Sequence, residues 1–166
     1  MPGSFNPLHP AHLAMARQAE SILGAACIFE LSVSNVDKGN LEIFEVRQRL
    51  NQDFGQHGVM LSNAARFTQK SNIYPGATLV VGADTMIRLS DASYYNNDPA
   101  ELDNAIKQIL NNGCRFLVFG RMIGNKFIDS KNIQISDRLR KNCQFVDQGE
   151  FEMNISSTIL RESEKD

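Results

Sequence analysis

The sequence predicts an α/β fold, a three-layer sandwich in which helices cover a mostly parallel sheet. Helical and strand patterns alternate along the whole chain, which is typical of this class. The strand pattern over 78–81 is a run of apolar residues that delivers Gly82, Ala83 and Asp84 to its carboxyl end. The 166 residues contain no linker or internal repeat, so we expect one domain spanning 1–166.

The first half of the chain predicts elements that alternate in type. The first helix is predicted from apolar residues at helical spacing that end before Gly24, a residue that often terminates helices. On the second helix, Glu45, Arg47 and Arg49 are expected on the side that faces water, together with Gln48. After the first helix the order is a buried strand over 27–33, a helix over 43–54, a strand over 59–61 and a helix over 64–73.

The second half continues the alternation. Tyr74-Pro75-Gly76 predicts a turn, and Asp98 and Pro99 begin an exposed helix that ends before Asn112-Gly113. The expected elements are strands over 78–81, 115–119 and 144–146, the helix over 99–110, and a last helix that opens at 155–158.

Composition excludes several classes of protein. The net charge is −2, from 17 basic and 19 acidic side chains, so no basic field attracts a nucleic acid. No apolar stretch reaches the roughly 20 residues of a membrane span, and Met1-Pro2 lead into a motif rather than a signal region, so we expect a cytoplasmic protein with no membrane partner. The three cysteines lack metal-ligand spacing and are expected to be buried thiols. Whether the chain forms a homo-oligomer stays open.

The most informative motif stands at the start of the chain. Gly3-Ser4-Phe5-Asn6-Pro7-Leu8-His9-Pro10-Ala11-His12 reads as a glycine-led turn that enters a helix, with Pro10 suited to the first helical position. The free N–H groups and dipole of a helix start attract phosphate. For a lone histidine, a capping or core role is the better interpretation, but the pair His9 and His12 in this frame favours a site.

A second motif stands near the other end. Ile155-Ser156-Ser157-Thr158-Ile159-Leu160-Arg161 places hydroxyl groups at a helix start, with an arginine one turn on. Hydroxyls and a guanidinium bind phosphate oxygens, although a serine-capped terminal helix is the alternative.

Together the two motifs resemble the GxFxPxHxGH and ISSTxIR patterns of the nucleotidyltransferase superfamily. The order and spacing of the intervening segments 30–38, 82–85 and 116–121 look closest to the nicotinate/nicotinamide mononucleotide adenylyltransferases and to related cytidylyltransferase-like proteins. The resemblance implies a Rossmann-like sheet with the ligand at the carboxyl ends of its strands.

The resemblance also implies roles for particular residues. His12, His9 and Lys38 would be catalytic, and Mg²⁺ would come with the nucleoside triphosphate rather than bind to protein side chains. The nucleotide would be held by Gly3, Ser4, Phe5, His9, His12, Gly82, Asp84, Ser156, Ser157, Thr158 and Arg161. The acceptor would meet Lys38, Arg47, Tyr94, Tyr95 and Arg121. Solvated surface charges are the alternative for Lys38 and Arg47, and a strand-end turn is the alternative for Gly82 and Asp84.

The chain departs from the family at three points. Only Met1-Pro2 precede Gly3, so the family's first strand is expected to be missing. Ala11 replaces the usual glycine, and there is no Trp to stack on a pyridine ring, a role left to Tyr94 or Tyr95. The function expected is transfer of AMP from ATP to nicotinate or nicotinamide mononucleotide. The alternatives are a cytidylyltransferase that uses CTP and a small phosphorylated alcohol, and an inactive nucleotide-binding module.

Overall fold

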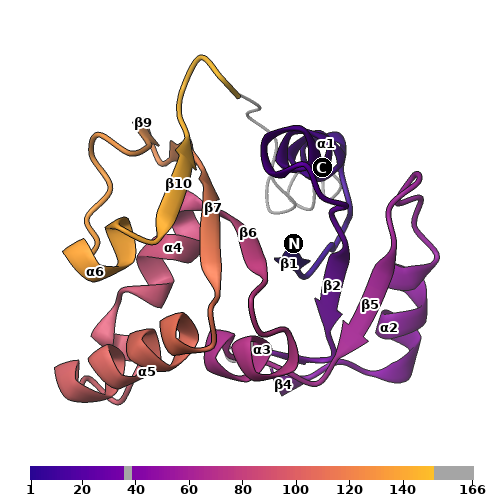
Figure 1. Ribbon diagram of the computed structural model, residues 1–166. Coiled ribbons are helices and arrows are strands. Elements are labelled where there is room, and N and C mark those ends of the chain that lie inside the picture. The colour runs from indigo at the N-terminus through magenta and orange to yellow at the C-terminus, as the bar shows by residue number, and fades with distance from the viewer. Residues whose placement is uncertain (36–38, 152–166) are drawn as a thin grey trace. The chain divides into compact units, whose positions relative to one another are not determined.

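The computed structural model describes residues 1–35 and 39–151 (Figure 1). Lys38, Ser156, Ser157, Thr158 and Arg161 lie outside the described residues, as does the helix expected to open at 155–158. The described residues fall into two compact units, one within Met1–Ala65 and one within Arg66–Glu152. Both contain parallel strands and helices, and the predicted α/β class is confirmed.

Unit 1 is built on a parallel sheet of order β1-β2-β5. The strands are β1 (Pro2–Gly3), β2 (Phe29–Ser32) and β5 (Val59–Ser62), with Gly3 opposite Leu31 and Leu31 opposite Leu61. The short strands β3 (Ser34–Asn35) and β4 (Gly39–Asn40) form an antiparallel pair. The helices are α1 (Pro10–Leu23) and α2 (Ile43–Leu50).

A short first strand is present, although the sequence predicts that it is missing. Pro2 and Gly3 form β1, which pairs with Glu30 and Leu31 of β2. The backbone N–H of Glu30 also donates to the Met1 carbonyl at 2.9 Å. The turn that follows Gly3 is therefore anchored to the sheet, which corrects the expectation that it has lost its strand.

Unit 2 is built on a parallel sheet of order β10-β7-β6. Its helices and strands run in the order α3 (Phe67–Ile73), β6 (Thr78–Gly82), α4 (Ala83–Leu89), the 3₁₀ turn η1 (Ala92–Tyr94), α5 (Pro99–Asn111), β7 (Arg115–Phe119), β8 (Arg121–Ile123), β9 (Lys126–Ile128), α6 (Asp137–Arg140) and β10 (Cys143–Val146). Its core is formed by apolar side chains of β6 and β7 with Met86 of α4 and Ile106 and Ile109 of α5.

Local signals account for most of these boundaries. Gly24 ends α1 in the left-handed conformation, with φ 61°, as predicted. The Asp98 carboxylate accepts from the Ala100 N–H and so caps α5. The expected helix over 43–54 ends at Leu50, because Gln52 and Phe54 are used in contacts with the first turn of the chain. The helix expected over 64–73 begins only at Phe67.

Several elements were not predicted from the sequence. Gly82-Ala83-Asp84 reads as a strand-end turn, but α4 begins there directly. The β8–β9 hairpin is held by its own antiparallel pairing, and a carbon at Gly120 would lie 2.6 Å from the Phe127 ring. Among the helices that the structure describes, none is long and apolar enough to cross a membrane.

Candidate functional site

The turn between β1 and α1 is built around a buried phenylalanine. Phe5 has φ 44°, in a region that bulky side chains rarely adopt, and only 1% of it is exposed. Such a conformation costs on the order of 1–3 kcal/mol and persists where the surroundings enforce it. Here the surroundings are aromatic, because the Phe5 ring meets the edges or faces of Phe29, Phe54 and His12 at centroid distances of 5.2, 5.7 and 5.2 Å.

Gly3 is required by the position of that ring. A Cβ at this position would lie 2.5 Å from Cε1 and Cζ of Phe5, which is closer than such atoms approach one another. Any side chain at position 3 would therefore displace Phe5. The ring of Phe5 faces the protein interior, where it contacts His12.

His9 and His12 lie together at the start of α1. His9 is the N-cap residue, and its backbone N–H donates to Nδ1 of His12 at 3.3 Å. The two rings stack with centroids 3.7 Å apart and an interplanar angle of 23°. Because Nδ1 of His12 accepts this bond, a neutral His12 carries its proton on Nε2. His9 is buried, whereas His12 is half-buried and Ser4 is exposed.

Two side chains from the end of α2 hold the turn. Arg49 Nη1 donates to the Ser4 carbonyl at 3.2 Å, and Gln52 Nε2 donates to the Phe5 carbonyl at 2.7 Å. Gln52 Oε1 accepts from the Leu8 N–H at 2.6 Å. Neither residue was among the predicted site residues.

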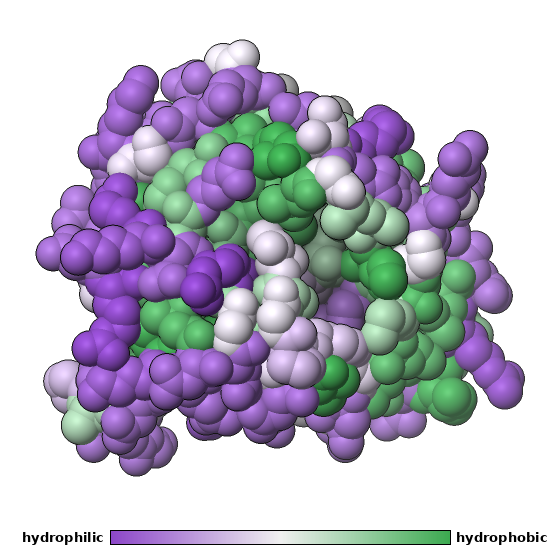
Figure 2. All heavy atoms as spheres, in the orientation of Figure 1, coloured by the Kyte–Doolittle hydropathy of each residue, from purple (hydrophilic) through white to green (hydrophobic). Residues whose placement is uncertain are grey.

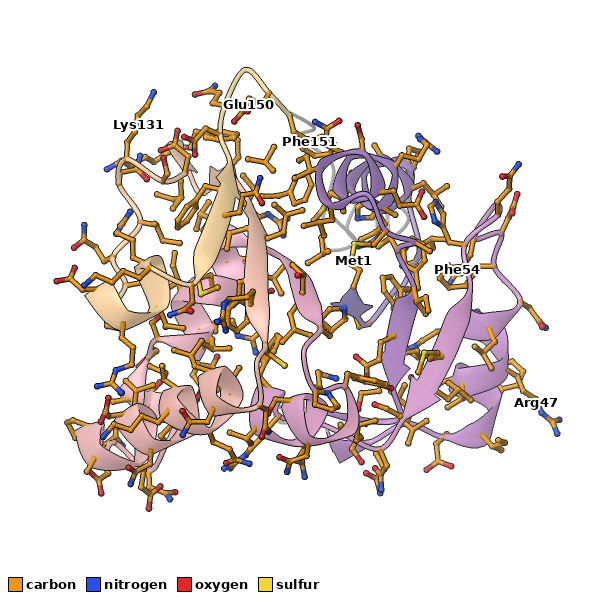
Figure 3. All side chains as sticks on the ribbon, in the orientation of Figure 1. Met1, Arg47, Phe54, Lys131, Glu150 and Phe151 are labelled. Atoms are coloured by element: carbon orange, nitrogen blue, oxygen red, sulfur yellow. The ribbon has the colours of Figure 1, made fainter. Side chains whose placement is uncertain are left out.

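The position of Arg49 corrects the sequence analysis. It was expected to face water, but it is only 8% exposed, and its Nη2 lies 3.2 Å from Oε1 of Glu45. Arg47, two residues earlier, is exposed and points away from the unit in Figure 3. The helical pattern alone could not separate these arginines, because the partner of Arg49 is a carbonyl 45 positions away. Among the described contacts, none tests the expected role of Arg47.

In unit 2 the structure brings together two predicted site residues, Asp84 and Arg121. Asp84 lies in the first turn of α4, and Arg121 follows β7, the strand next to β6. Arg121 Nη1 lies 3.0 Å from Asp84 Oδ1, with both side chains about one third exposed at 34% and 38%. The pair therefore stands at the carboxyl ends of neighbouring parallel strands, where ligands of α/β sheets bind.

Gly82 leaves room for this pair. A Cβ at position 82 would lie 2.6 Å from Asp84 Oδ1 and 3.4 Å from Arg121 Cδ. The Gly-x-Asp spacing therefore has a local cause, in that the aspartate turns back over the glycine.

Tyr94 and Tyr95 lie on and after η1. The Tyr94 hydroxyl accepts from Arg88 Nε at 2.9 Å, and the Arg88 guanidinium carbon is 5.2 Å from the Tyr94 ring centroid. The Tyr95 hydroxyl donates to the Leu89 carbonyl at 3.3 Å, and burial raises its pKa. Tyr94 is therefore linked to α4, the helix that carries Asp84, at a position one turn further along.

Burial favours the protonated form of the cysteines. Cys27 and Cys114 are buried, as predicted, and burial raises the pKa of both thiols. Cys143 is half-buried, and burial raises its pKa to about 12. All three thiols are protonated at neutral pH. Within residues 1–35 and 39–151, no three metal-ligating side chains gather in one place.

The comparison with protein families agrees with the geometry of unit 1. The model of the cytidylyltransferase-like family matches residues 1–53 of the 166. This segment contains the whole turn, both histidines and the two side chains that hold the turn. The match supports a nucleotidyltransferase-like relationship and, in general terms, a nucleotidyltransferase activity. No curated protein and no solved structure matches the chain.

Proposed function

We propose that the protein transfers AMP from ATP to the phosphate of nicotinate or nicotinamide mononucleotide, with release of pyrophosphate. The observation that carries the proposal is the first turn of α1, where two stacked histidines stand at a helix start beside an anchored turn in which Ser4 is exposed. The family match over residues 1–53 supports the reaction class. The donor and the acceptor come from the resemblance of the motifs.

The reaction does not need a covalent intermediate with the protein. A phosphate oxygen of the mononucleotide attacks the α-phosphorus of ATP, the new P–O bond forms, and the bond to the pyrophosphate oxygen breaks. The pyrophosphate carries away the electron pair of that bond. Two anions must be aligned, and the charge that spreads over the phosphoryl oxygens must be stabilised.

His12 is suited to stabilise that charge. Its Nδ1 accepts from the His9 N–H, so a neutral His12 carries its proton on Nε2, and we propose that this N–H donates a hydrogen bond to a phosphoryl oxygen. His9, stacked on His12 and buried, fixes the plane of the ring. The backbone of Gly3 and Ser4 and the start of α1 would contact the triphosphate.

Magnesium would be held by the phosphate oxygens rather than by a protein cage. The groups at the start of α1 are donors, namely an imidazole N–H and the N–H groups of the helix start. Donors of this kind suit phosphate oxygens, while Mg²⁺ usually keeps several waters and takes its remaining ligands from the substrate.

The other proposed contacts follow the family's pattern. Asp84 would accept from the ribose hydroxyls, and Arg121 would meet a phosphate while it keeps Asp84 in place. Tyr94 or Tyr95 would stack on the pyridine ring, and Lys38 and Arg47 would meet the acceptor phosphate. Ser156, Ser157, Thr158 and Arg161 would bind the β- and γ-phosphates.

A cytidylyltransferase that uses CTP and a small phosphorylated alcohol is the second candidate. The description of the matching family model favours keeping it. The experiment is a screen of ATP and CTP, with magnesium, against both mononucleotides and a set of phosphorylated alcohols, read by pyrophosphate release. Turnover of a mononucleotide with ATP supports the first proposal, and turnover of an alcohol phosphate with CTP alone replaces it by the second. Absence of turnover with tight nucleotide binding would support a binding module.

A further inference from the structure

We infer that Gln52, assisted by Arg49, is a positioning residue that sets the conformation of the turn and, through it, the position of His12. The inference rests on the proposed function for its kinetic part. Its structural part can be measured without turnover.

The side-chain amide of Gln52 completes the turn from Phe5 to Leu8. In a closed β-turn the carbonyl of the first residue accepts directly from the N–H of the fourth. Here the amide stands between those two groups, donating to the Phe5 carbonyl at 2.7 Å and accepting from the Leu8 N–H at 2.6 Å. One side chain therefore satisfies both ends of the turn and holds them apart.

Gln52 is itself held by the end of α2. Its Nε2 also donates to the Arg49 carbonyl at 2.9 Å, and Arg49 reaches the preceding residue of the turn, Ser4. The charge of Arg49 is balanced by Glu45 at 3.2 Å, and the guanidinium is buried. Arg49 is thus arranged to support backbone rather than to bind a phosphate.

The turn also positions the His12 ring. Phe5 contributes an edge-on ring contact at 5.2 Å, and His9 contributes both the stack at 3.7 Å and the N–H bond to Nδ1. All three contacts come from residues of the turn or its end. A shift of the turn therefore moves the imidazole, and a displacement of about 1 Å in a reacting group can cost about 10²-fold in rate.

The test compares Gln52→Met with Gln48→Met. Methionine keeps the length of the side chain but removes all three of its hydrogen bonds, including the two to the turn, and Gln48 is an exposed position on α2 that serves as the control. For Gln52→Met we expect kcat to fall about 10²-fold. The KM for the triphosphate should change much less, and amide exchange at Leu8 should accelerate. Gln48→Met should match the wild type in all three.

Gln52→Glu separates positioning from a general loss of structure. The carboxyl can accept from the Leu8 N–H, but only its protonated form can also donate to the Phe5 carbonyl. Its turnover relative to wild type should therefore rise as the pH is lowered from about 8 to about 5, whereas the ratio for Gln52→Met should stay constant. A ratio independent of pH for both variants would contradict the proposal.

The outcomes distinguish this inference from the proposed function. If the wild type shows no turnover, the proposed function fails, and the inference is judged by Leu8 amide exchange and by the NMR signals of the His12 ring in Gln52→Met. Unchanged exchange and unchanged ring signals would overturn it. If the wild type is active, an unchanged kcat in Gln52→Met would overturn it as well.

Discussion

At the scale of single residues, the two histidines have different tasks despite their shared place at the start of α1. His9 caps the helix, is buried and stacks on His12, while His12 accepts from the His9 N–H through Nδ1. The pattern of two histidines three positions apart is informative because one turn of helix separates them. One histidine therefore orients the ring of the other.

His12→Ala should reduce turnover far more than nucleotide affinity. Loss of a donor aimed at developing charge costs roughly 10²–10³ in turnover, while backbone contacts at the helix start still bind the phosphates. Steady-state kinetics and nucleotide titration of the same preparation measure the two effects. Equal losses in turnover and affinity would assign His12 to ground-state binding, and unchanged turnover would remove it from the mechanism.

Gly82→Ala should weaken nucleotide binding while leaving stability nearly unchanged. The added carbon would lie 2.6 Å from Asp84 Oδ1, so the carboxylate must leave Arg121. A partly exposed ion pair contributes at most about 1 kcal/mol to stability, whereas a charged hydrogen bond to a ligand is worth about 1.5–3 kcal/mol. We therefore expect roughly a tenfold or greater rise in Kd.

The control for this substitution is Gly58→Ala. A carbon at position 58 would meet Ile28 at an ordinary 3.9 Å. Thermal melting of both variants measures the change in stability, and nucleotide titration measures the change in Kd. Equal nucleotide affinity in Gly82→Ala and the wild type would show that the Asp84–Arg121 pair is not part of the nucleotide site.

At the scale of elements, local signals predicted most of the fold. Gly24 and Asp98 set helix boundaries as expected, and the apolar runs over 78–81 and 115–119 became β6 and β7. The misses share a physical cause, which is tertiary contact. Helix α2 ends before Gln52, whose side chain donates to the Phe5 carbonyl. Arg49 is buried and donates to the Ser4 carbonyl, which is distant in sequence. No local pattern contains these partners.

The candidate site likewise combines residues proposed from local motifs with contacts that depend on the fold. The sequence proposes Gly3, His9 and His12, and it pairs Gly82 with Asp84, because these residues belong to contiguous motifs; their role in binding stays a prediction. The adjacency of Asp84 and Arg121 depends on β6 and β7 being neighbours and is a result of the fold. The hydrogen bonds that Arg49 and Gln52 donate to the turn could be found only in the structure, because their partners lie 45 and 47 positions away.

Lengthening β1 should stabilise unit 1. In the described sheet β1 has two residues and lies at the edge, and the Met1 amino group donates to the Ile28 carbonyl at 2.6 Å. Adding about four apolar residues ahead of Met1 continues this ladder beside residues 26–28. We expect a higher melting temperature together with faster turnover, because the turn gains a firmer anchor. An extended protein that melts and turns over like the original would show that two residues suffice.

Strand β10 carries a pH-dependent contribution to stability through Cys143. Burial raises the pKa of its thiol from 9.0 to about 12. The raised pKa means that the folded state holds a proton that the unfolded state releases, so this contribution is complete below about pH 9 and is lost as the pH rises toward about 12. In Cys143→Ala, melting temperature should therefore decline less steeply over that window. Identical slopes for the two proteins would contradict the assignment.

At the scale of the whole molecule, the described residues form two units, and each contains residues that the sequence proposes for a site. The turn and the histidines lie in unit 1, and the Asp84–Arg121 pair lies in unit 2. The expectation of a single domain over 1–166 stays a prediction.

The surface of unit 1 also has an apolar part. Met60 and Leu61 on β5, the other edge of its sheet, are 37% and 49% exposed. Figure 2 shows apolar residues gathered where β5 lies.

The two ends of the chain should meet at the triphosphate. If His12 and Arg161 both contact it, the residues must lie within the length of one nucleotide in the folded protein. A His12→Cys/Arg161→Cys double variant should therefore be cross-linked by a short bifunctional thiol reagent, and each single variant should not. Because burial raises the pKa of all three native thiols, which are protonated at neutral pH, they give little background reaction. A double variant that is not cross-linked under native conditions would contradict the hypothesis that the motifs at the two chain ends bind one triphosphate.

The hydrogen bonds of the Gln52 side-chain amide determine how much of the chain must be moved to transplant this motif into another protein. The ten residues from Gly3 to His12 do not hold their own shape, because two hydrogen bonds at the ends of the turn come from a residue 44 and 47 positions away. A loop graft that copies only those ten residues onto another sheet would carry the histidines without their geometry. The smallest portable module runs from β1 through Phe54, whose ring completes the packing around Phe5. The structural unit of the turn is therefore a supersecondary structure, because the shape of the motif depends on a residue outside it.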